Sequence, residues 1–328
     1  MSGEPGHRIL VTGAGGFVGG WLLRELRVRL GEADRIVSTY RDANEAKADP
    51  GGIVLDLADR DAIGRTVAQT RPTALIHLAA ISAVGAVARD PDAAWDVNVK
   101  ATHHLATALL QHAPQARFIQ IGSGEVYGGS AAAGADLIDE AAPLQPHNLY
   151  AVTKAAADLL IGQMAAQGLD AVRFRTFNHT GPGQATDFAV PAFAAQIARI
   201  EAGLQEPVIF VGDLAAMRDF CDVRDVVRAY AQAALARRRP APVINLAGGH
   251  SCSVRSVLDR LLALSDATIE IHVDPARLRT PEPPRPDVDV SLAGKTLGWR
   301  PEIPLEETLR DVLDHWRGIV AAEQVKAG

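Results

Sequence analysis

The sequence predicts an α/β protein with a doubly wound parallel sheet and a smaller C-terminal substrate-binding lobe. Three observations predict this fold class. A glycine-rich turn separates a short apolar strand from a helical run near the N-terminus, strand and helix signals then alternate through the first half, and glycine and proline become frequent after Phe177. Alternating strands and helices are typical of βαβ units, which pair their strands in parallel.

The expected strands are short apolar runs, at 8–12, 35–39, 53–55, 74–78, 117–121 and 171–175, with a late strand at 243–246 that returns to the sheet. Helices are expected at 21–30, around 60–70, 93–113 and 149–168, and later near 188–203 and 305–322. We therefore divide the chain into a dinucleotide-binding domain, 1–176 with a returning segment near 220–247, and a mainly substrate-binding lobe, 177–328. Such a lobe lies over the carboxyl ends of the strands, where ligands bind in these sheets.

Composition and charge exclude several classes of protein. The chain has 328 residues, 48% of them hydrophobic, and a net charge of −6 with dispersed basic residues, so no nucleic-acid surface is expected. Its two cysteines, Cys221 and Cys252, cannot form a disulfide framework or a zinc cluster, and no metal site is predicted. No stretch is apolar enough to span a bilayer, and the polar N-terminus lacks a targeting core. We expect a cytoplasmic protein without a membrane partner.

The first motif is the turn Gly13-Ala14-Gly15-Gly16-Phe17-Val18-Gly19, which joins the first expected strand to the first helix. Gly13 permits a sharp turn, Gly16 lets a phosphate approach the backbone, and Gly19 lets helix and strand pack closely. The helix N-terminus supplies amide donors and a positive potential. With a strand before it and a helix after it, the turn predicts the pyrophosphate cradle of a Rossmann domain.

The end of the second strand bears on the choice of cofactor. A site that selects NAD usually has Asp or Glu there to accept from the ribose 2′-hydroxyl. This chain has Tyr40 followed by Arg41. No carboxylate at that point repels a 2′-phosphate, and a guanidinium is available to pair with one. The sequence therefore favours NADP(H), with NAD(H) as the alternative.

The second motif is the pair Tyr150 and Lys154, four residues apart in a run rich in alanine and leucine. Such a run predicts a helix, and residues at i and i+4 share one helix face. A neighbouring ammonium stabilises phenolate, so we expect the pKa of Tyr150 to be lowered and the residue to act as a proton donor. Tyr-x-x-x-Lys also occurs by chance, as a surface tyrosine beside a solvated lysine. The rest of the chain favours the chemical interpretation.

Further motifs accompany these two: Asp56-Leu57, His77-Leu78-Ala79-Ala80, Asn98 and Ser123. Together they resemble the extended short-chain dehydrogenase/reductases, or epimerase/dehydratase family, that act on nucleotide sugars. The run Arg175 to Gln184, with its Gly-Pro-Gly-Gln ending, and Val190-Pro191-Ala192-Phe193 look most similar to the branch that reduces GDP-4-keto-6-deoxy-D-mannose. The resemblance extends to Gly298-Trp299-Arg300-Pro301.

The resemblance implies roles for individual residues. Cofactor contacts would come from Gly13, Gly16, Phe17, Val18, Gly19, Arg41, Asp56, Leu57, Leu78, Ala79, Ala80, Asn98, Tyr150, Lys154 and His179. The GDP-sugar substrate would be bound by Ser82, Glu125, Asn178, Val190, Arg218 and Arg279. Arginines suit a diphosphate because the guanidinium forks onto its oxygens. Arg285-Pro286, six residues beyond Arg279, offers the family's Arg-Pro dipeptide, so either arginine is a candidate.

The catalytic hypothesis assigns three residues. Tyr150 donates a proton to the alkoxide formed when a ketone is reduced, Lys154 lowers the pKa of Tyr150 and holds the nicotinamide ribose, and Ser123 hydrogen-bonds the carbonyl oxygen. The activity implied is the NADPH-dependent reduction of the 4-keto group of GDP-4-keto-6-deoxy-D-mannose to a GDP-6-deoxyhexose such as GDP-D-rhamnose. Apolar residues on the helices near 93–113 and 149–168 imply a homodimer through the four-helix interface of the family.

Three alternatives stay open at this point. A GDP-mannose 4,6-dehydratase uses the same tyrosine and lysine and needs a carboxylate base, whose position Glu125 occupies in Ser123-Gly124-Glu125-Val126-Tyr127. A UDP-sugar 4-epimerase would retain NAD tightly. A non-catalytic NADP-sensing protein is disfavoured because Ser123, Tyr150 and Lys154 are all present.

Overall fold

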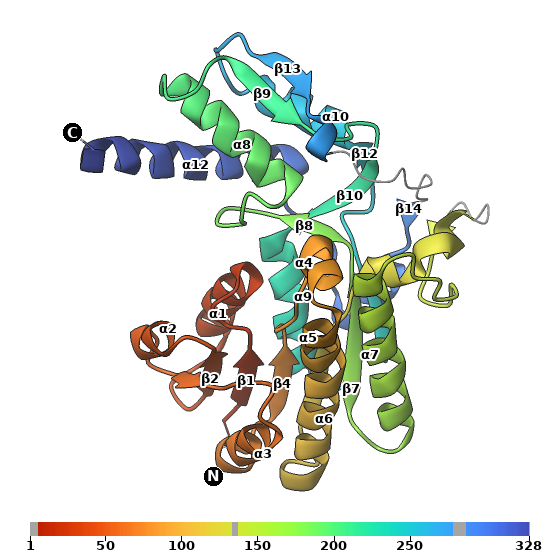
Figure 1. Ribbon diagram of the computed structural model, residues 1–328. Helices are drawn as coiled ribbons and strands as arrows, with labels where there is room; N and C mark the ends of the chain where they lie inside the picture. The colour runs from red at the N-terminus through yellow and green to blue at the C-terminus, as the bar shows by residue number, and fades with distance from the viewer. Residues whose placement is uncertain (1–5, 133–136, 278–286, 328) are drawn as a thin grey trace.

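A parallel sheet of seven strands forms the base of the molecule, in the order β11-β7-β5-β4-β1-β2-β3 (Figure 1). The computed structural model describes residues 6–132, 137–277 and 287–327. The strands of this sheet are β1 (Arg8–Thr12), β2 (Arg35–Tyr40), β3 (Gly52–Val54), β4 (Ala74–His77), β5 (Arg117–Ile121), β7 (Ala171–Thr176) and β11 (Val243–Leu246). Every pairing in it is parallel. The predicted doubly wound fold class is confirmed.

Helices cover both faces of the sheet (Figure 1). The apolar side chains of the strands are buried beneath them. One face packs against α1 (Phe17–Arg29) and α9 (Val223–Leu235), around Leu22, Leu26 and Val226. The other packs against α3 (Arg60–Thr70), α6 (Ala101–His112) and α7 (Leu149–Ala166), around Leu105 and Phe118. Strands buried on both faces explain the near-continuous apolar runs in the sequence.

The helix expected at 93–113 is present, and it contains a π-helical turn that the sequence did not predict. The segment consists of α5 (Pro91–Trp95), a π-helical turn (Asp96–Lys100) and α6. Asp90 caps α5 and Pro91 stands at its start, where a missing amide hydrogen costs nothing. Single π turns often occur at functional sites because they change the direction of a side chain within a helix. Here the turn contains Asn98.

Several short elements were not expected. They are α2 (Ala43–Ala48), α4 (Val84–Arg89), α11 (Ser291–Leu297), two 3₁₀ segments (Gly124–Ala132 and Pro275–Arg277) and the small strand pair β6 (Leu137–Ile138) and β14 (Asp287–Val288). Such elements are shorter than the window over which periodicity can be recognised.

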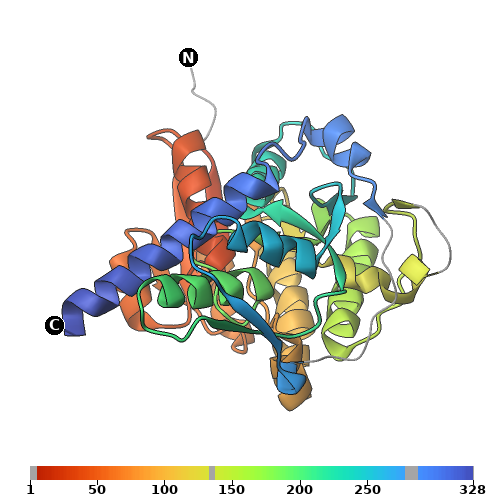
Figure 2. The same cartoon turned by 90° about the horizontal axis from the view of Figure 1, so that it is seen from above.

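The C-terminal lobe lies over the carboxyl ends of the strands, in front of the sheet when seen from above (Figure 2). Its core is formed by α8 (Ala189–Glu201), α10 (Val254–Leu262) and α12 (Leu305–Ala327), with Phe193, Val257 and Leu313 buried among them. Its strands are β8 (Asn178–Thr180), β9 (Val208–Val211), β10 (Met217–Asp222), β12 (Ser251–Ser253) and β13 (Glu270–Val273). They form a three-stranded sheet, β12-β10-β8, and the pair β13-β9.

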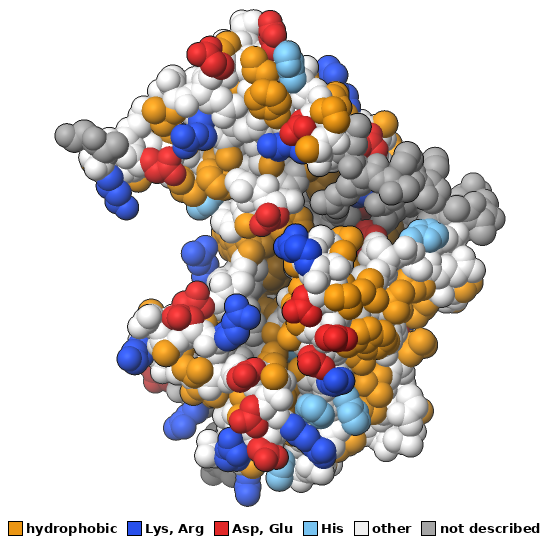
Figure 3. All heavy atoms as spheres, viewed as in Figure 1, with side chains coloured by type: hydrophobic (Ala, Val, Ile, Leu, Met, Phe, Trp, Pro, Cys, Tyr) orange, Lys and Arg blue, Asp and Glu red, His pale blue; other side chains and the backbone are white. Residues whose placement is uncertain are grey.

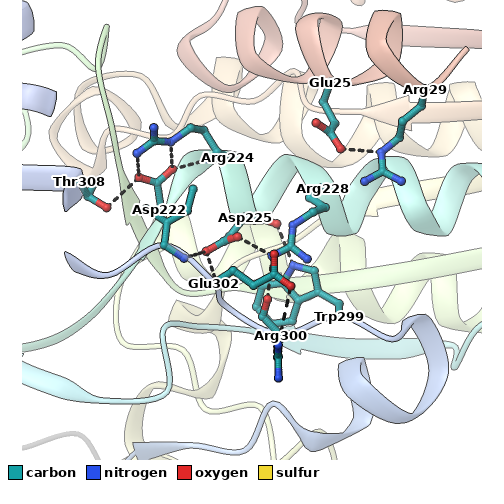
Figure 4. A network of polar contacts seen from close by, with 11 residues as sticks. Glu25, Arg29, Asp222, Arg224, Asp225, Arg228, Trp299, Arg300, Glu302 and Thr308 are labelled. Carbon is teal, nitrogen blue, oxygen red and sulfur yellow. Dashed lines mark hydrogen bonds and ion pairs between the residues drawn. The ribbon is translucent and has the colours of Figure 1, made fainter. Parts of the chain in front are cut away.

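The start of α9 joins the lobe to the sheet (Figure 4). The buried carboxylate of Asp222 accepts from Arg224 and from the Thr308 hydroxyl of α12, at 2.7 Å from the latter. One turn later, Asp225 accepts from Arg228 and from the backbone amides of Glu302 and Ile303 at 2.8 and 2.9 Å. Two buried carboxylates at the N-terminus of one helix therefore fix the segment that leads into α12.

Candidate active site

A cavity of about 1730 Å³ lies at the carboxyl ends of the strands, between the sheet and the lobe. It spans the ends of β1 and β4, which neighbour each other although they are not consecutive in the chain. Ligands bind at such a switch point in open α/β sheets. Most of the predicted site residues line this one cavity: Gly13, Gly16, Phe17, Val18, Gly19, Arg41, Asp56, Leu57, Leu78, Ala79, Ala80, Ser82, Ser123, Glu125, Tyr150, Lys154, Asn178, His179 and Arg218.

The glycine turn has the geometry of a dinucleotide cradle. Gly13 has a φ of 74°, and a Cβ there would lie 2.7 Å from the Ala79 amide nitrogen. A Cβ on Gly19 would lie 2.5 Å from the carbonyl oxygens of Gly13 and Ala14, so glycine permits the close approach of α1 to β1. A Cβ on Gly16 meets only one atom, at 3.4 Å, and Gly16 begins α1 without a side-chain cap. Open space before uncapped helix amides fits a pyrophosphate.

The adenosine end of the cavity lies between the glycine turn and the end of β2. Arg41 lines it and is exposed, as a group that pairs with a 2′-phosphate must be. Two carboxylates that belong to none of the predicted motifs, Asp42 and Glu45, line it too. Asp42 follows Arg41 directly and caps α2, so an N-cap signal was present. The position of Glu45 at the cavity could not be predicted, because it depends on the path of α2, a helix that the sequence did not predict.

The catalytic residues converge from two elements. Lys154, on α7, is 7% exposed and donates to the Ile121 carbonyl at 2.7 Å, across to the end of β5. Ser123 follows β5 and forms a hydrogen bond with the phenol of Tyr150. The Ser123 hydroxyl also accepts from the Glu125 amide at 3.2 Å. The three side chains predicted to act together therefore surround one end of the cavity.

The pKa of Tyr150 departs from the sequence expectation. Burial raises the pKa of Tyr150 to about 12, the Ser123 hydrogen bond works against the rise, and the charge of Glu125 adds to it. Burial also lowers the pKa of Lys154 to about 8. The expected lowering by Lys154 is wrong for this structure because the ammonium is directed to the Ile121 carbonyl and is itself disfavoured by burial. The phenol therefore keeps its proton, as a proton donor requires.

Two buried side chains support the catalytic end from behind. Asn98 holds the backbone of Ile81 through both polar atoms, at 2.8 and 3.1 Å, and donates to the Thr153 hydroxyl at 3.0 Å. Asn98 is not among the residues that line the cavity, where a cofactor contact was predicted for it. It instead anchors Thr153, the residue before Lys154. His77 lies between the hydroxyls of Thr12 and Thr102 at 2.6 and 3.0 Å. Burial, with a smaller effect of Lys154, lowers the pKa of His77 to about 3.

The lobe side of the cavity begins with β8. His179 stacks nearly parallel to Phe17, with ring centroids 6.3 Å apart, and burial lowers its pKa. The Gln184 amide donates to the His179 carbonyl at 3.1 Å, which fixes the turn after β8. Arg218, on β10, lines the same side of the cavity as Asn178 on β8, because β8 and β10 are paired. The predicted diphosphate-binding arginine therefore lines the same cavity as the glycine turn.

One predicted substrate residue, Val190, is not brought to the cavity. Val190 is 2% exposed and packs in the core of the lobe, because the apolar face of α8 turns toward α10 and α12. Arg279 lies outside the described residues, as does Arg285. The structure adds His147 and Asn148, just before Tyr150, and Tyr230 of α9. Proximity to Tyr150 could have indicated the first two, whereas nothing local marked Tyr230.

Comparison with known proteins agrees with this geometry. A profile of the family described as GDP-mannose 4,6 dehydratase matches residues 10–312. The chain belongs to this family. The predicted class, an NAD(P)-dependent enzyme of the extended short-chain dehydrogenase/reductase family, is therefore confirmed.

Individual relatives extend over almost the whole chain. It is 34% identical to GDP-6-deoxy-D-mannose reductase of Pseudomonas aeruginosa, over 97% of this chain and 99% of that protein. It is 28% identical to dTDP-6-deoxy-L-talose 4-dehydrogenase (NAD(P)(+)) of Kitasatospora kifunensis, over 93% and 94%. The structure of RMD from Pseudomonas aeruginosa complexed with NADPH matches with a TM-score of 0.83 and 32% identity, covering 95% of this chain and 99% of that one. The UDP-glucose 4-epimerase of Thermus thermophilus, in complex with NAD, matches at 0.80 and 26%, with coverage of 95% and 99%.

Two further findings concern membrane-spanning helices and metal-binding groups. Among the residues that the structure describes, no helix is long and apolar enough to cross a membrane. Over the same residues, no group of three or more His, Cys, Asp or Glu side chains is arranged to hold a metal ion.

Proposed function

We propose that the protein reduces the 4-keto group of GDP-4-keto-6-deoxy-D-mannose, with NADPH, to a GDP-6-deoxyhexose such as GDP-D-rhamnose. One observation carries the proposal: Ser123, Tyr150 and Lys154 surround one end of a cavity whose other end is a glycine cradle, in a chain that matches a GDP-6-deoxy-D-mannose reductase over nearly its full length. The nucleotide sugar is assigned to the lobe side, where Asn178 and Arg218 face the cavity.

Each catalytic side chain contributes a specific step. When bound, the dinucleotide supplies a hydride to the ketone carbon. Ser123 donates to the ketone oxygen and so stabilises negative charge as that charge develops, a role supported by its position in the cavity wall. Tyr150 then gives its proton to this oxygen, and the transfer is downhill because an alkoxide is a stronger base than a phenolate. Lys154 places a positive charge beside the reacting centre while it stays protonated.

A direct assay tests the proposal. The protein is incubated with NADPH and the 4-keto sugar nucleotide, and the absorbance of the reduced nicotinamide is followed together with the product. We expect one NADPH consumed for each 6-deoxyhexose formed and no turnover of GDP-mannose. Turnover of GDP-mannose without net change in the nicotinamide absorbance would contradict the proposal.

The second candidate, GDP-mannose 4,6-dehydratase, is favoured by Glu125. Its carboxylate lines the cavity and contributes to the raised pKa of Tyr150, so it lies near the reacting phenol. A carboxylate there suits the removal of a proton from the sugar. Glu125→Gln separates the two candidates: a dehydratase would lose most of its turnover of GDP-mannose, whereas a reductase would keep most of its turnover of the 4-keto sugar.

We also propose that the protein is a homodimer, as the family resemblance implies. Apolar side chains gather over α5 and α7 on one face of the molecule (Figure 3). Trp95 on α5 and Leu159 on α7 are exposed, Leu159 by 62%. A patch of this kind on the described surface suits a second copy of the chain. Sedimentation of the wild type and of Leu159→Asp tests this: the wild type should sediment as a dimer and the variant as a monomer.

A further inference from the structure

The adenosine end of the cavity contains a carboxylate that the proposed mechanism does not use. Glu45 of α2 lines the cavity together with Arg41, and both side chains are exposed. Asp42, between them in sequence, is occupied in capping α2, since it accepts from the amides of Asn44 and Glu45 at 2.7 and 3.0 Å. Within the described part of the chain, Arg41 and Glu45 form no ion pair with each other or with another residue.

Glu45 lies directly against the glycine turn. A Cβ added to Gly15 would collide with the Glu45 carboxylate, and it would lie 3.2 Å from the ring of Tyr40. The carboxylate therefore stands between the cradle for the pyrophosphate and the end of β2. In this fold the adenosine ribose binds at that place, with its 2′ substituent next to the end of the second strand.

Tyr40 cannot take the place of an acidic ribose ligand because its phenol is directed elsewhere. The Tyr40 hydroxyl donates to Asp49 at 2.7 Å, and the same carboxylate accepts from Ser38 and, at 2.8 Å, from Arg27. Three donors on one carboxylate hold the phenol at the C-terminal end of α2, where Asp49 is the capping residue. The side chains left to meet the 2′ position are Arg41, which attracts a phosphate, and Glu45, which repels one.

We propose that Glu45 is a specificity-determining residue that weakens binding of the 2′-phosphate of NADP and so keeps the site open to NAD. A carboxylate accepts a hydrogen bond from a ribose 2′-hydroxyl but repels a phosphate dianion. Arg41 has the opposite effect, and the balance of the two sets the selectivity. The proposal rests on the pyridine-dinucleotide part of the proposed function and is independent of the sugar substrate.

Binding of the adenosine half alone gives a test that needs no turnover. The probes are adenosine 2′,5′-diphosphate and adenosine 5′-monophosphate, titrated by calorimetry into the wild type and Glu45→Gln. Removing one charge close to a dianion at a solvated site should tighten the 2′,5′-diphosphate about three- to tenfold. Binding of the monophosphate should stay within about twofold of the wild type, or weaken.

Matched variants make the test specific. Glu32→Gln removes an exposed carboxylate from the loop before β2, at the far end of that strand, and should change neither dissociation constant. Glu45→Lys should tighten the 2′,5′-diphosphate more than Glu45→Gln does. The effect should be larger at pH 8 than at pH 5.5, because the phosphate gains its second charge near a pH of about 6.

The outcomes distinguish this proposal from the wider one. If Glu45→Gln leaves both probes unchanged, or tightens both equally, the role of Glu45 is overturned while the proposed reductase activity stands. If the wild type binds neither probe nor either intact dinucleotide, the cofactor assignment fails and the role of Glu45 fails with it.

Discussion

The two ends of the cavity achieve selectivity by different physical means. At the catalytic end, the half-buried Tyr150 and the buried Lys154 and His77 are shielded enough from water for their pKa values to move far from the ordinary ones, to about 12, 8 and 3. At the adenosine end, Arg41 and Glu45 are exposed side chains in water. Burial magnifies every charge and hydrogen bond at the first end, whereas water weakens them at the second. Substitutions should therefore have large effects at one end and small ones at the other.

The largest effect is expected for Tyr150→Phe. Loss of the proton donor should lower kcat by about 10²- to 10⁴-fold. The dissociation constant for NADPH should hardly change, which fluorescence titration would measure. Tyr40→Phe is the matched control at the adenosine end: it removes one hydroxyl, the donor to Asp49, and should change kcat by less than about threefold. Similar losses of kcat in the two variants would contradict the expected contrast between the two ends of the cavity.

The next effect concerns stability in acid. The folded chain holds His77 neutral, with a pKa of about 3, while the unfolded chain takes up a proton near the ordinary value of 6.5. Above that pH both states are neutral and His77 has no effect. As the pH falls from about 6.5 to 4.5 the unfolded state gains the proton alone, which costs about 2 kcal/mol of stability. Urea unfolding of the wild type and of His77→Gln would measure it, and the variant should show a shallower decline. An equal decline in both would show that His77 is not the group responsible.

A smaller effect is expected on the alkaline side of the pH profile of kcat/KM. Lys154 has a pKa of about 8, so its positive charge is lost as the pH rises through that value. The kcat/KM of the wild type should fall above about pH 8 and approach a tenfold loss per pH unit. Lys154→Arg keeps its charge throughout this range. In that variant the fall should disappear, whatever the remaining activity, and a fall at the same pH would assign the loss to another group.

The smallest effect is expected at Arg41. Arg41→Ala should weaken NADPH binding about three- to tenfold in dilute buffer, with less change for NADH. In about 0.5 M salt the difference should nearly vanish, because exposed charges are screened within a few ångströms. The loss of kcat in Tyr150→Phe should not depend on salt. Titration of both variants at the two salt concentrations therefore checks the contrast between the ends directly.

The catalytic end was largely accessible to prediction because its motifs are local. The glycine turn, Ser123 two residues after β5, and the i, i+4 pair on α7 can each be recognised from a few adjacent residues. The pKa of Tyr150 was not accessible, since it depends on burial and on where the Lys154 ammonium points. Those depend on the whole packed structure, and the i, i+4 rule says only that two side chains share a face.

The adenosine end and the lobe were less accessible. Glu45 lies on a helix of six residues, too short for its period to be recognised, and its place beside Gly15 is a tertiary contact. Val190 belongs to an apolar run, and the sequence of such a run does not distinguish a residue that lines a cavity from one in the core. In the structure Val190 packs in the core of the lobe. Tyr230 lines the cavity although it is distant in sequence from the other lining residues, and no motif around it indicates this position.

The path of the chain through the sheet constrains how this protein can be taken apart or recombined. After leaving at β7 the chain builds part of the lobe, then returns to place α9 on one face and β11 beside β7. A fragment ending at residue 176 would leave the edge of β7 open and a face of apolar side chains bare, which favours aggregation. Chimaeras that exchange the sugar-binding part with a relative therefore need three junctions, one after β7 and one on each side of the segment that carries α9 and β11. A single crossover after β7 should give insoluble protein.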